Sequence, residues 1–171
     1  STPTAGTSNL RLGVNAGDAI ASGGNYNVVV GDEAGTAITT GDSNSAVGYG
    51  ALDANTTGSS NNAVGYDALG ANTTASQNNA FGRNSLGSNT TGSDNSAFGQ
   101  NTLGSATTAS NNTAVGADAG AAVTTGANNT AVGYIALDAN TTGHSNTVVG
   151  SASGTAVTTG INNVAIGYTA L

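Results

Sequence analysis

An apolar residue followed directly by glycine recurs along the whole chain at a nearly constant interval. Successive glycines of this pair are 17 residues apart, except in the first interval, which has 18 and can take its extra residue in the Gly23-Gly24 pair. Such a period predicts stacked units, each forming one coil. These ten anchor glycines are Gly13, Gly31, Gly48, Gly65, Gly82, Gly99, Gly116, Gly133, Gly150 and Gly167. The apolar residues before them, expected to point into the core, are Leu12, Val30, Val47, Val64, Phe81, Phe98, Val115, Val132, Val149 and Ile166.

The repeat predicts strands rather than helices. A unit of 17 residues is too short for a pair of helices, and no segment has the apolar spacing of an amphipathic helix. Glycine, asparagine and Thr-Thr pairs at fixed offsets favour short strands separated by turns. We therefore expect an all-β fold, a β-solenoid (β-roll or β-helix) of ten coils with 17 residues per coil. Residues 1–171 should form a single domain with one continuous core and no separate capping domain.

A compensating exchange between two positions supports a shared interior. Four residues after the anchor glycine, six coils carry leucine and the other four carry glycine. Only the glycine coils carry isoleucine or valine three residues further on. A close-packed core has to refill volume that is lost, so both positions are predicted to face inward. The leucines are Leu52, Leu69, Leu86, Leu103, Leu137 and Leu171, and the exchanged pairs are Gly17/Ile20, Gly35/Ile38, Gly120/Val123 and Gly154/Val157.

An asparagine stands four residues before every anchor glycine. Stacked strands lie about 4.8 Å apart, so the amide of one asparagine can donate to the next and form a ladder. The alternative is that asparagine only tolerates a left-handed turn there. The structural ladder that we predict consists of Asn9, Asn27, Asn44, Asn61, Asn78, Asn95, Asn112, Asn129, Asn146 and Asn163. The anchor glycines are interpreted as turn positions that need positive φ or a close backbone approach.

Composition and charge exclude several classes of partner. Charged residues make up only 6% of the chain, with a formal net charge of −7, whereas they make up about a quarter of ordinary domains. Arg11 and Arg83 are the only basic residues, so nucleic acid and anionic membranes are poor partners. No apolar run reaches the length that membrane insertion requires.

No residue pattern indicates catalysis or a bound cofactor. The only histidine, His144, lies in a turn-like segment, and nothing resembles a nucleophile–base pair. The nine acidic residues do not recur at one repeat position, and the calcium-binding phrase G-G-x-G-x-D is absent. Calcium trapped by oxygen-rich turns is the alternative left open. We expect no enzyme activity, no metal site and no cofactor.

Two stretches resemble known repeats. "NNTAVGYIALDANTTGHSNTVVG" (128–150) resembles the 17-residue repeats of phage tail-fibre and bacterial surface proteins, and "NNVAIGYTA" (162–170) is similar to the β-roll head of trimeric autotransporter adhesins. The resemblance covers essentially the whole chain. It implies a β-roll in a fibre or adhesin at a cell or virion surface, and leaves the activity open because fold does not fix function.

The two ends of the chain fit together in the repeat frame. Leu171 is the fourth residue after Gly167, and Ser1 holds the fifth position of the coil before Gly13, so the first and last coils are incomplete and complementary. Head-to-tail stacking would complete a coil at each junction, and such a heterologous contact gives an open filament. The predicted assembly ends are Ser1, Thr2, Pro3 and Thr4, together with Gly167, Tyr168, Thr169, Ala170 and Leu171.

Three functions fit the sequence. The first is a structural subunit of an extracellular filament whose partner is a further copy of itself. The second is a trimeric fibre or adhesin shaft, in which the alanine beside the apolar residue of most coils would face outward toward sister chains. The third is an ice-binding surface made of Thr pairs such as Thr39-Thr40. A secreted or surface location is expected in each case. Glycans could decorate the Asn-x-Thr triplets at Asn55, Asn72, Asn89, Asn111, Asn128 and Asn140.

Overall fold

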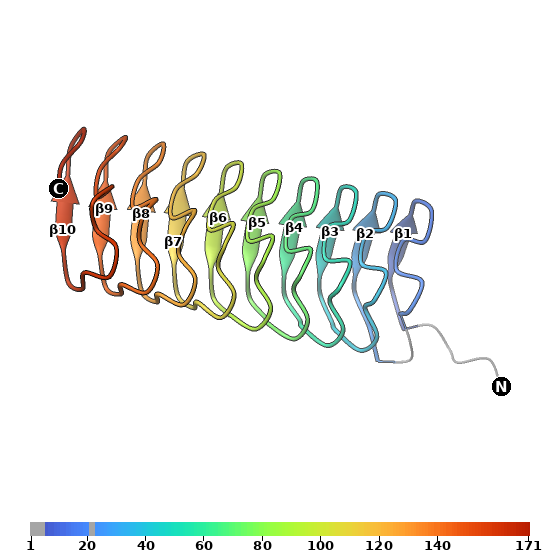
Figure 1. Cartoon of the computed structure of the whole chain (residues 1–171). Coiled ribbons are helices and arrows are strands. Elements are labelled where there is room, and N and C mark those ends of the chain that lie inside the picture. Colours follow the sequence, from blue (N-terminus) through green and yellow to red (C-terminus); the bar gives the residue numbers. More distant parts are fainter. Residues whose placement is uncertain (1–5, 21–22) are drawn as a thin grey trace.

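The computed structural model describes residues 6–20 and 23–171, which form an elongated β-solenoid (Figure 1). Ten strands, one per coil, stack in chain order into one parallel sheet, and the described residues contain no helix. The all-β solenoid with its 17-residue spacing is therefore confirmed. The strands are β1 (Leu10–Leu12), β2 (Val28–Val30), β3 (Ser45–Val47), β4 (Asn62–Val64), β5 (Asn79–Phe81), β6 (Ser96–Phe98), β7 (Thr113–Val115), β8 (Thr130–Val132), β9 (Thr147–Val149) and β10 (Val164–Ile166).

The anchor glycines allow the coils to stack closely. Each follows a strand and has a φ between 122° and 139°. A Cβ atom on Gly31 would lie 2.6 Å from the carbonyl oxygen of Gly48, and one on Gly65 would lie 2.6 Å from that of Gly82. Only a residue without a side chain permits this approach at such a φ. The strands end where this turn begins.

The two faces of the sheet are the reverse of what the sequence suggested. The middle residue of each strand points inward and is buried in β2–β10; this inner row consists of Arg11, Val29, Ala46, Ala63, Ala80, Ala97, Ala114, Ala131, Val148 and Ala165. The residue before the anchor glycine, which we predicted for the core, points outward, and Val47 and Phe98 expose 37% and 41% of their surface. The prediction of an outward alanine stripe is wrong. The leucine, isoleucine or valine side chains that follow the anchor glycines already fill the interior, so mostly small side chains fit on the inner side of the sheet.

The exchange between leucine and Ile or Val is explained by direct contact. Leu52 and Leu69 are fully buried, and so are Ile38 and Val123 in coils with glycine at the leucine position. A Cβ atom on Gly35 would lie 2.7 Å from Val29 Cγ1 and 2.8 Å from Ile38 Cδ1. Both positions therefore face one interior, and the inner row also takes part: its two valines, Val29 and Val148, occur in coils that lack the leucine.

The leucines of this row have an unusual backbone. Leu52, Leu69 and Leu86 have φ values of 54°, 52° and 51°, in the left-handed region that non-glycine residues seldom adopt. This conformation costs about 1–2 kcal/mol per residue, and burial of a leucine side chain returns about 1.5–3 kcal/mol. Leucine is therefore tolerated because it fills the core, and glycine is tolerated where another side chain does so.

The row of asparagines before the strands lies in the interior. From Asn27 to Asn146 these side chains are at most 2% exposed. Asn44 is typical: its backbone N–H donates to Asn27 Oδ1 at 2.9 Å, and its Nδ2 donates to Asn27 Oδ1 at 3.1 Å and to the Gly58 carbonyl at 2.9 Å. The left-handed residue of this turn is the one before the asparagine, for example Ser43 with a φ of 58°. Each such asparagine thus links its turn to the preceding asparagine and to the turn that precedes the next strand.

A second, shorter row of buried asparagines has unequal partners. Asn72 Nδ2 donates to Asn55 Oδ1 at 2.8 Å and to the Ala75 carbonyl at 3.1 Å, and Asn72 Oδ1 accepts from Asn89 at 3.0 Å. Asn140 is equally buried, yet neither of its side-chain polar atoms has a partner among the described residues. The neighbouring coils carry Val123 and Val157 at this position, and valine can neither donate nor accept.

These two asparagines should respond in opposite ways to alanine. Asn72→Ala should lower the free energy of unfolding by about 2–3 kcal/mol, because it removes three buried hydrogen bonds and leaves partner groups unsatisfied. Asn140→Ala should be neutral or stabilising by up to about 1 kcal/mol, because it removes a buried amide without partners. The chain already contains this combination, Leu103 with Ala106, in another coil. Urea denaturation followed by circular dichroism measures both, and an equal loss of stability would contradict the hydrogen-bond assignment.

Candidate assembly site: the two ends of the solenoid

The first described coil presents an open edge of the sheet. β1 pairs only with β2 among the described strands. Leu10 and Leu12 are 55% and 64% exposed, well above the 36–41% of Val47, Val64, Phe81, Phe98 and Val115, which are covered on both sides. The extra apolar surface therefore belongs to the end face. An unpaired strand edge with apolar side chains is a template for another strand.

Arg11 packs on the other side of its own coil. It occupies the inner row, where seven of the other nine coils have alanine. Its Cγ atom would be 3.4 Å from a Cβ on Gly17, so its stem packs where that coil lacks a leucine. Its Nε donates to the Ala16 carbonyl at 2.9 Å, and its Nη2 forms an ion pair with Asp18 Oδ1 at 3.1 Å. Arg11 thus closes the first coil with an aliphatic stem while its charge is paired at the surface.

The last coil presents the opposite edge. β10 pairs only with β9 among the described strands, and Val164 and Ile166 are both 70% exposed. A Cβ atom on Gly167 would meet nothing within 4 Å, whereas every other anchor glycine lies against the next coil. Among the described residues, nothing covers the end face of the last coil, which repeats the surface on which each interior coil stacks.

The backbone and side-chain ladders have a direction, so the two ends differ. The first strand residue donates toward the following coil, as from Leu10 N–H to the Asn27 carbonyl at 2.9 Å. The anchor glycine donates toward the preceding coil, as from Gly167 N–H to the Val149 carbonyl at 2.8 Å. In the asparagine ladder, Asn163 receives no donor at its Oδ1 from the described residues, and Asn9 N–H has no acceptor among them. One end therefore offers the groups that the other end lacks.

The predicted end residues fall into two groups. Ser1, Thr2, Pro3 and Thr4 lie outside the described residues. Gly167–Leu171 follow the geometry of the repeat: Thr169 and Leu171 have φ values of 52° and 68°, and the Ala170 carbonyl accepts from Gly154 N–H at 2.7 Å and from Ser153 Oγ at 3.1 Å. Tyr168 and Leu171 are 79% and 62% exposed. The C-terminal segment is thus shaped like the start of a complete coil.

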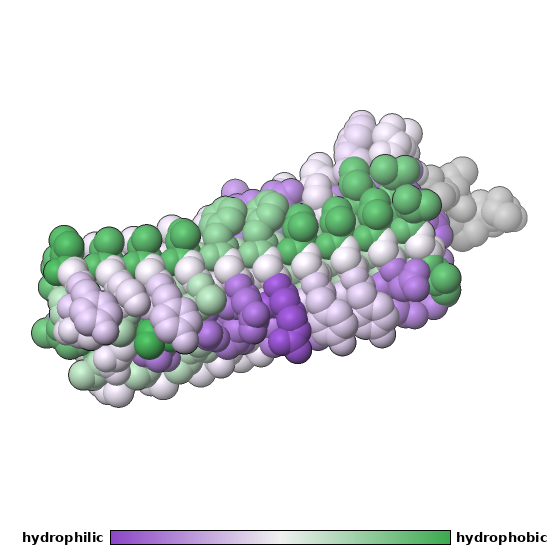
Figure 2. Space-filling view, turned by 90° about the horizontal axis from the view of Figure 1, so that it is seen from above, coloured by the Kyte–Doolittle hydropathy of each residue, from purple (hydrophilic) through white to green (hydrophobic). Residues whose placement is uncertain are grey.

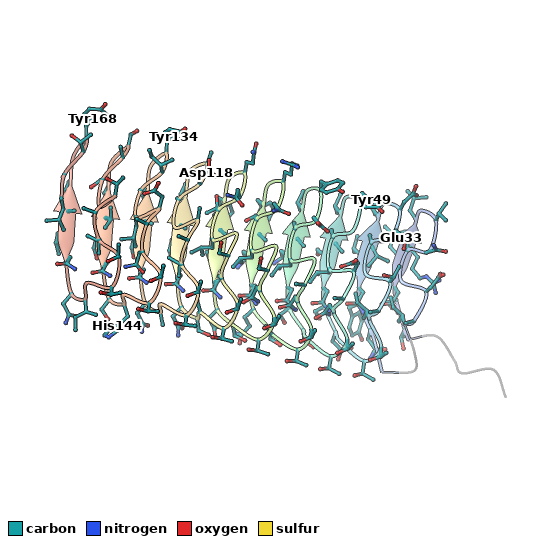
Figure 3. The ribbon with its side chains drawn as sticks, viewed as in Figure 1. Glu33, Tyr49, Asp118, Tyr134, His144 and Tyr168 are labelled. Atoms are coloured by element: carbon teal, nitrogen blue, oxygen red, sulfur yellow. The ribbon has the colours of Figure 1, made fainter. Side chains whose placement is uncertain are left out.

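The tyrosines and the histidine lie at different edges of the solenoid. Figure 3 shows Tyr49, Tyr134 and Tyr168 at the turns that follow the strands, and His144 at the opposite edge. His144 Nδ1 lies 3.2 Å from Ser145 Oγ and is exposed, as expected for a surface residue. The tyrosines are more than half exposed, and Tyr49 stacks on Tyr66 with ring centroids 5.3 Å apart.

Acidic residues do not form a metal centre in the part of the chain that the structure describes. Burial raises the pKa of the Asp53 carboxyl, and the carboxylates of Asp67 and Glu33 raise this pKa further. The folded state therefore holds the Asp53 proton more tightly than the unfolded chain. Ionisation of this group lowers stability as the pH rises through its folded pKa.

The Asn-x-Thr triplets are not equally accessible. Asn55, Asn72, Asn89 and Asn140 are fully buried. Asn111 and Asn128 are exposed on left-handed turns, with φ values of 60° and 58°. Only these two of the six are accessible to a glycan in the folded state.

Comparison with known proteins gives no match: no family model, curated protein or solved structure is similar to this chain at a significant level. The described residues also include no helix that is long and apolar enough to cross a membrane. The function therefore has to be inferred from the geometry of the molecule.

Two features of the ends are visible in the sequence but were not predicted. Arg11 was considered only as a charge, although it interrupts a row of small residues at the first strand. The residue before the anchor glycine was also a signal. It is Leu12 in the first coil and Ile166 in the last, and valine or phenylalanine in all the others. Both features become meaningful once the inner and outer rows are known.

Proposed function

We propose that this protein is a structural subunit of an extracellular filament that grows by head-to-tail stacking of solenoid coils. One observation carries the proposal: the free edges of β10 and β1 present complementary halves of the same parallel ladder. The partner of each chain is a further copy of the same chain. The chain needs neither a cofactor nor enzymatic activity for this role.

The register of the junction follows from the register within the sheet. Each strand pairs with the next residue for residue, as Ser45 with Asn62. At a junction Val164 would lie beside Leu10 of the next copy, and Ile166 beside Leu12. Val164 N–H would then donate to the Asn9 carbonyl, and Asn163 Oδ1 would accept from Asn9 N–H, as these rows do in every interior coil.

The apolar side chains of the two ends support the same contact. Val164 and Ile166 on one end, and Leu10 and Leu12 on the other, would lose the extra exposure that distinguishes them from interior coils. Burial of this surface favours association. Arg11 keeps Ala16 and Asp18 of its own coil as partners, so stacking does not leave the guanidinium without partners.

The other two functions have less support. The trimeric shaft was inferred from the resemblance of the repeats and from an outward alanine row; those alanines are buried, which leaves the resemblance as its support. For ice binding, the first hydroxyl is engaged in seven of the eight Thr pairs, as from Thr39 Oγ1 to the Thr56 carbonyl at 3.0 Å. Each of these seven pairs then offers one exposed threonine, for example Thr57. An extracellular location rests on the resemblance of the repeats to those of fibre and surface proteins.

Electron microscopy of the purified chain tests the proposal. We expect unbranched fibres with an axial repeat of roughly 48 Å, since ten coils each rise about 4.8 Å. A folded tag on a cleavable C-terminal linker should keep the protein monomeric, and cleavage should restore growth, which separates steric blocking from misfolding. Persistent monomers at high concentration, or fibres with a repeat unrelated to ten coils, would contradict the proposal. Short blunt trimers would favour the second function instead.

A further inference from the structure

The outward face of the ten-stranded sheet carries no charged residue. It consists of two rows, the first and the third residue of every strand. The first, the leading row, is Leu10, Val28, Ser45, Asn62, Asn79, Ser96, Thr113, Thr130, Thr147 and Val164. The third, the apolar row, is Leu12, Val30, Val47, Val64, Phe81, Phe98, Val115, Val132, Val149 and Ile166. Figure 2 shows a continuous apolar line along the length of the molecule.

The apolar row reads almost the same from both ends. A large aliphatic residue is followed by three valines and a phenylalanine, and the second half repeats this order in reverse. Phe81 and Phe98 occupy the two central strands, β5 and β6, and stack with ring centroids 5.1 Å apart. The leading row is apolar at both ends and polar and uncharged between them. Nothing in the folding of a single chain requires this symmetry, because each coil packs only on its neighbours.

We infer that this face binds the same face of a second copy of the chain, in antiparallel orientation. A two-fold axis parallel to the strands reverses the stacking direction and keeps the strand direction. It therefore places apolar row on apolar row and leading row on leading row. Strand β5 then faces β6 of the partner copy, Phe81 packs on Phe98, and Val30 packs on Val149. An isologous contact of this kind requires a self-complementary surface, which the mirrored row provides.

A parallel pair would not explain the symmetry. With the two-fold axis along the solenoid, each strand meets its own copy, so any order of residues would match itself. If the axis lay over the apolar row, the leading row would face the row after the anchor glycines. That row contains Asp32 and Arg83, whose charges would lose water at the contact. The antiparallel pair keeps both uncharged rows together.

Spacing and charge favour a second copy over an unrelated partner. The side chains of the apolar row repeat at about the strand spacing of 4.8 Å, and another copy presents the same spacing over all ten strands. The chain has a formal net charge of −7, and none of its nine acidic residues lies in the two outward rows, so contact through this face does not bring carboxylates together. The ten arrows in Figure 1 lie side by side in nearly the same orientation, so two such sheets can meet along their whole length.

The size of the face indicates how strong the contact is. Ten strands, each contributing three residues, give about 500 Å² per copy, less than the roughly 800 Å² per partner of a standard stable interface. A pair of single chains is therefore weak and needs high concentration. Where chains are also joined end to end, the contacts add along the length. The pairing does not depend on head-to-tail growth, because eight of the ten strands of the face, β2 to β9, take no part in the junction.

Cross-linking tests the orientation, and the chain is suited to it because it has no cysteine. Val30→Cys and Val149→Cys are made separately, each with Val164→Pro, which blocks growth from the β10 edge. A bismaleimide that spans about 10 Å, the distance between packed sheets, is added to each protein alone and to the mixture. We expect a cross-linked dimer in the mixture and little in either protein alone, since copies of Val30 would lie about seven strands apart.

Two other outcomes of the cross-linking experiment would contradict the antiparallel pairing. A Val30→Cys protein that cross-links to itself as well as it does to Val149→Cys indicates a parallel or random contact. No dimer at millimolar concentration in any sample means that the face is not an interface.

A matched pair of surface variants checks the contact independently. In the cross-linking mixture, Phe81→Lys should reduce the yield of dimer at least tenfold, because it places a charge in the centre of the face. Thr57→Lys, on an exposed turn outside this face, should leave the yield unchanged. Both residues are exposed, so the variants should keep the circular dichroism spectrum of the parent. Equal yields from the two variants would exclude the outward sheet face as the site of contact.

Discussion

Leu69→Asp should unfold the middle of the solenoid. Leu69 is fully buried between Leu52 and Leu86 of the adjacent coils, and the described interior around it offers no cationic side chain. A carboxylate there would lose its hydration without gaining a partner. We expect the free energy of unfolding to fall by about 4 kcal/mol or more, in the range of an unpaired buried charge.

The linear stacking of coils determines how this loss of stability appears in denaturation and proteolysis experiments. Each coil contacts only its neighbours, so a damaged coil divides the stack into two shorter segments. Thermal denaturation followed by circular dichroism should change from one transition to two, or to a broad transition at lower temperature. Limited proteolysis should cleave near residue 69 and release fragments from either side. One sharp transition at the parent temperature would show that Leu69 does not lie in a dry core.

Asp67→Asn provides the matched control two residues away. Asp67 is half-buried with a φ of 57°, and two following coils carry Asn84 and Asn101 at the same position with φ values of 59° and 54°. Asparagine therefore fits this left-handed backbone. The change also removes one of the carboxylates that raise the pKa of Asp53. We expect a stability change within about 0.5 kcal/mol.

The period and the core exchange were predictable because both consist of residue types that recur at fixed intervals along the chain. A 17-residue interval without a helical stripe allows few architectures, and the replacement of leucine by Ile or Val at fixed offsets indicates a shared interior. Ile38 and Leu69 are in fact fully buried. The number of strands per coil was not predictable, because the remaining positions adopt turns whose residues, such as Ser43 and Ser60, have no strong preference of their own.

The orientation of the strands was predicted wrongly for a physical reason. Alternation along a strand fixes two faces but not which of them is buried, and we assigned the larger residue to the core. The core volume was already occupied by Leu52 and its equivalents, so only alanine fits opposite them. A signal was present in the sequence: Val29 and Val148 replace alanine in coils where Gly35 and Gly154 replace leucine. This second exchange identifies the inner row.

The left-handed leucines could not be derived from residue preferences. Leucine disfavours positive φ, and any local rule would place it in a strand or helix. The alternation of leucine with glycine at one position is the only indication of this backbone.

The candidate site could be predicted only in part. The repeat frame indicated Gly167–Leu171. The capping role of Arg11 depends on contacts with Ala16 and Asp18 that spacing alone does not reveal.

Val164→Pro should stop head-to-tail growth while leaving the subunit folded. Residues of a parallel strand bond alternately to the two neighbouring strands. Because Val28 N–H donates to Asn44 of the following coil at 2.8 Å, the N–H of Val164 points to the open side of β10. Proline removes this donor and is tolerated on an edge strand. The bonds that hold β10 to β9, such as Gly167 N–H to the Val149 carbonyl, are not touched.

Val164→Thr is the matched control for this edge. The three preceding coils carry Thr113, Thr130 and Thr147 at the same position, so threonine fits the strand and keeps its N–H. We expect fibre growth in this variant at a rate within a few-fold of the parent, and at least a hundredfold slower growth with proline, measured by light scattering and electron microscopy. Melting temperatures of the monomeric forms should agree within a few degrees. Normal fibres from the proline variant would mean that the β10 edge does not form the junction, whereas loss of growth in both variants would show that the contact depends on the valine side chain rather than on the backbone ladder.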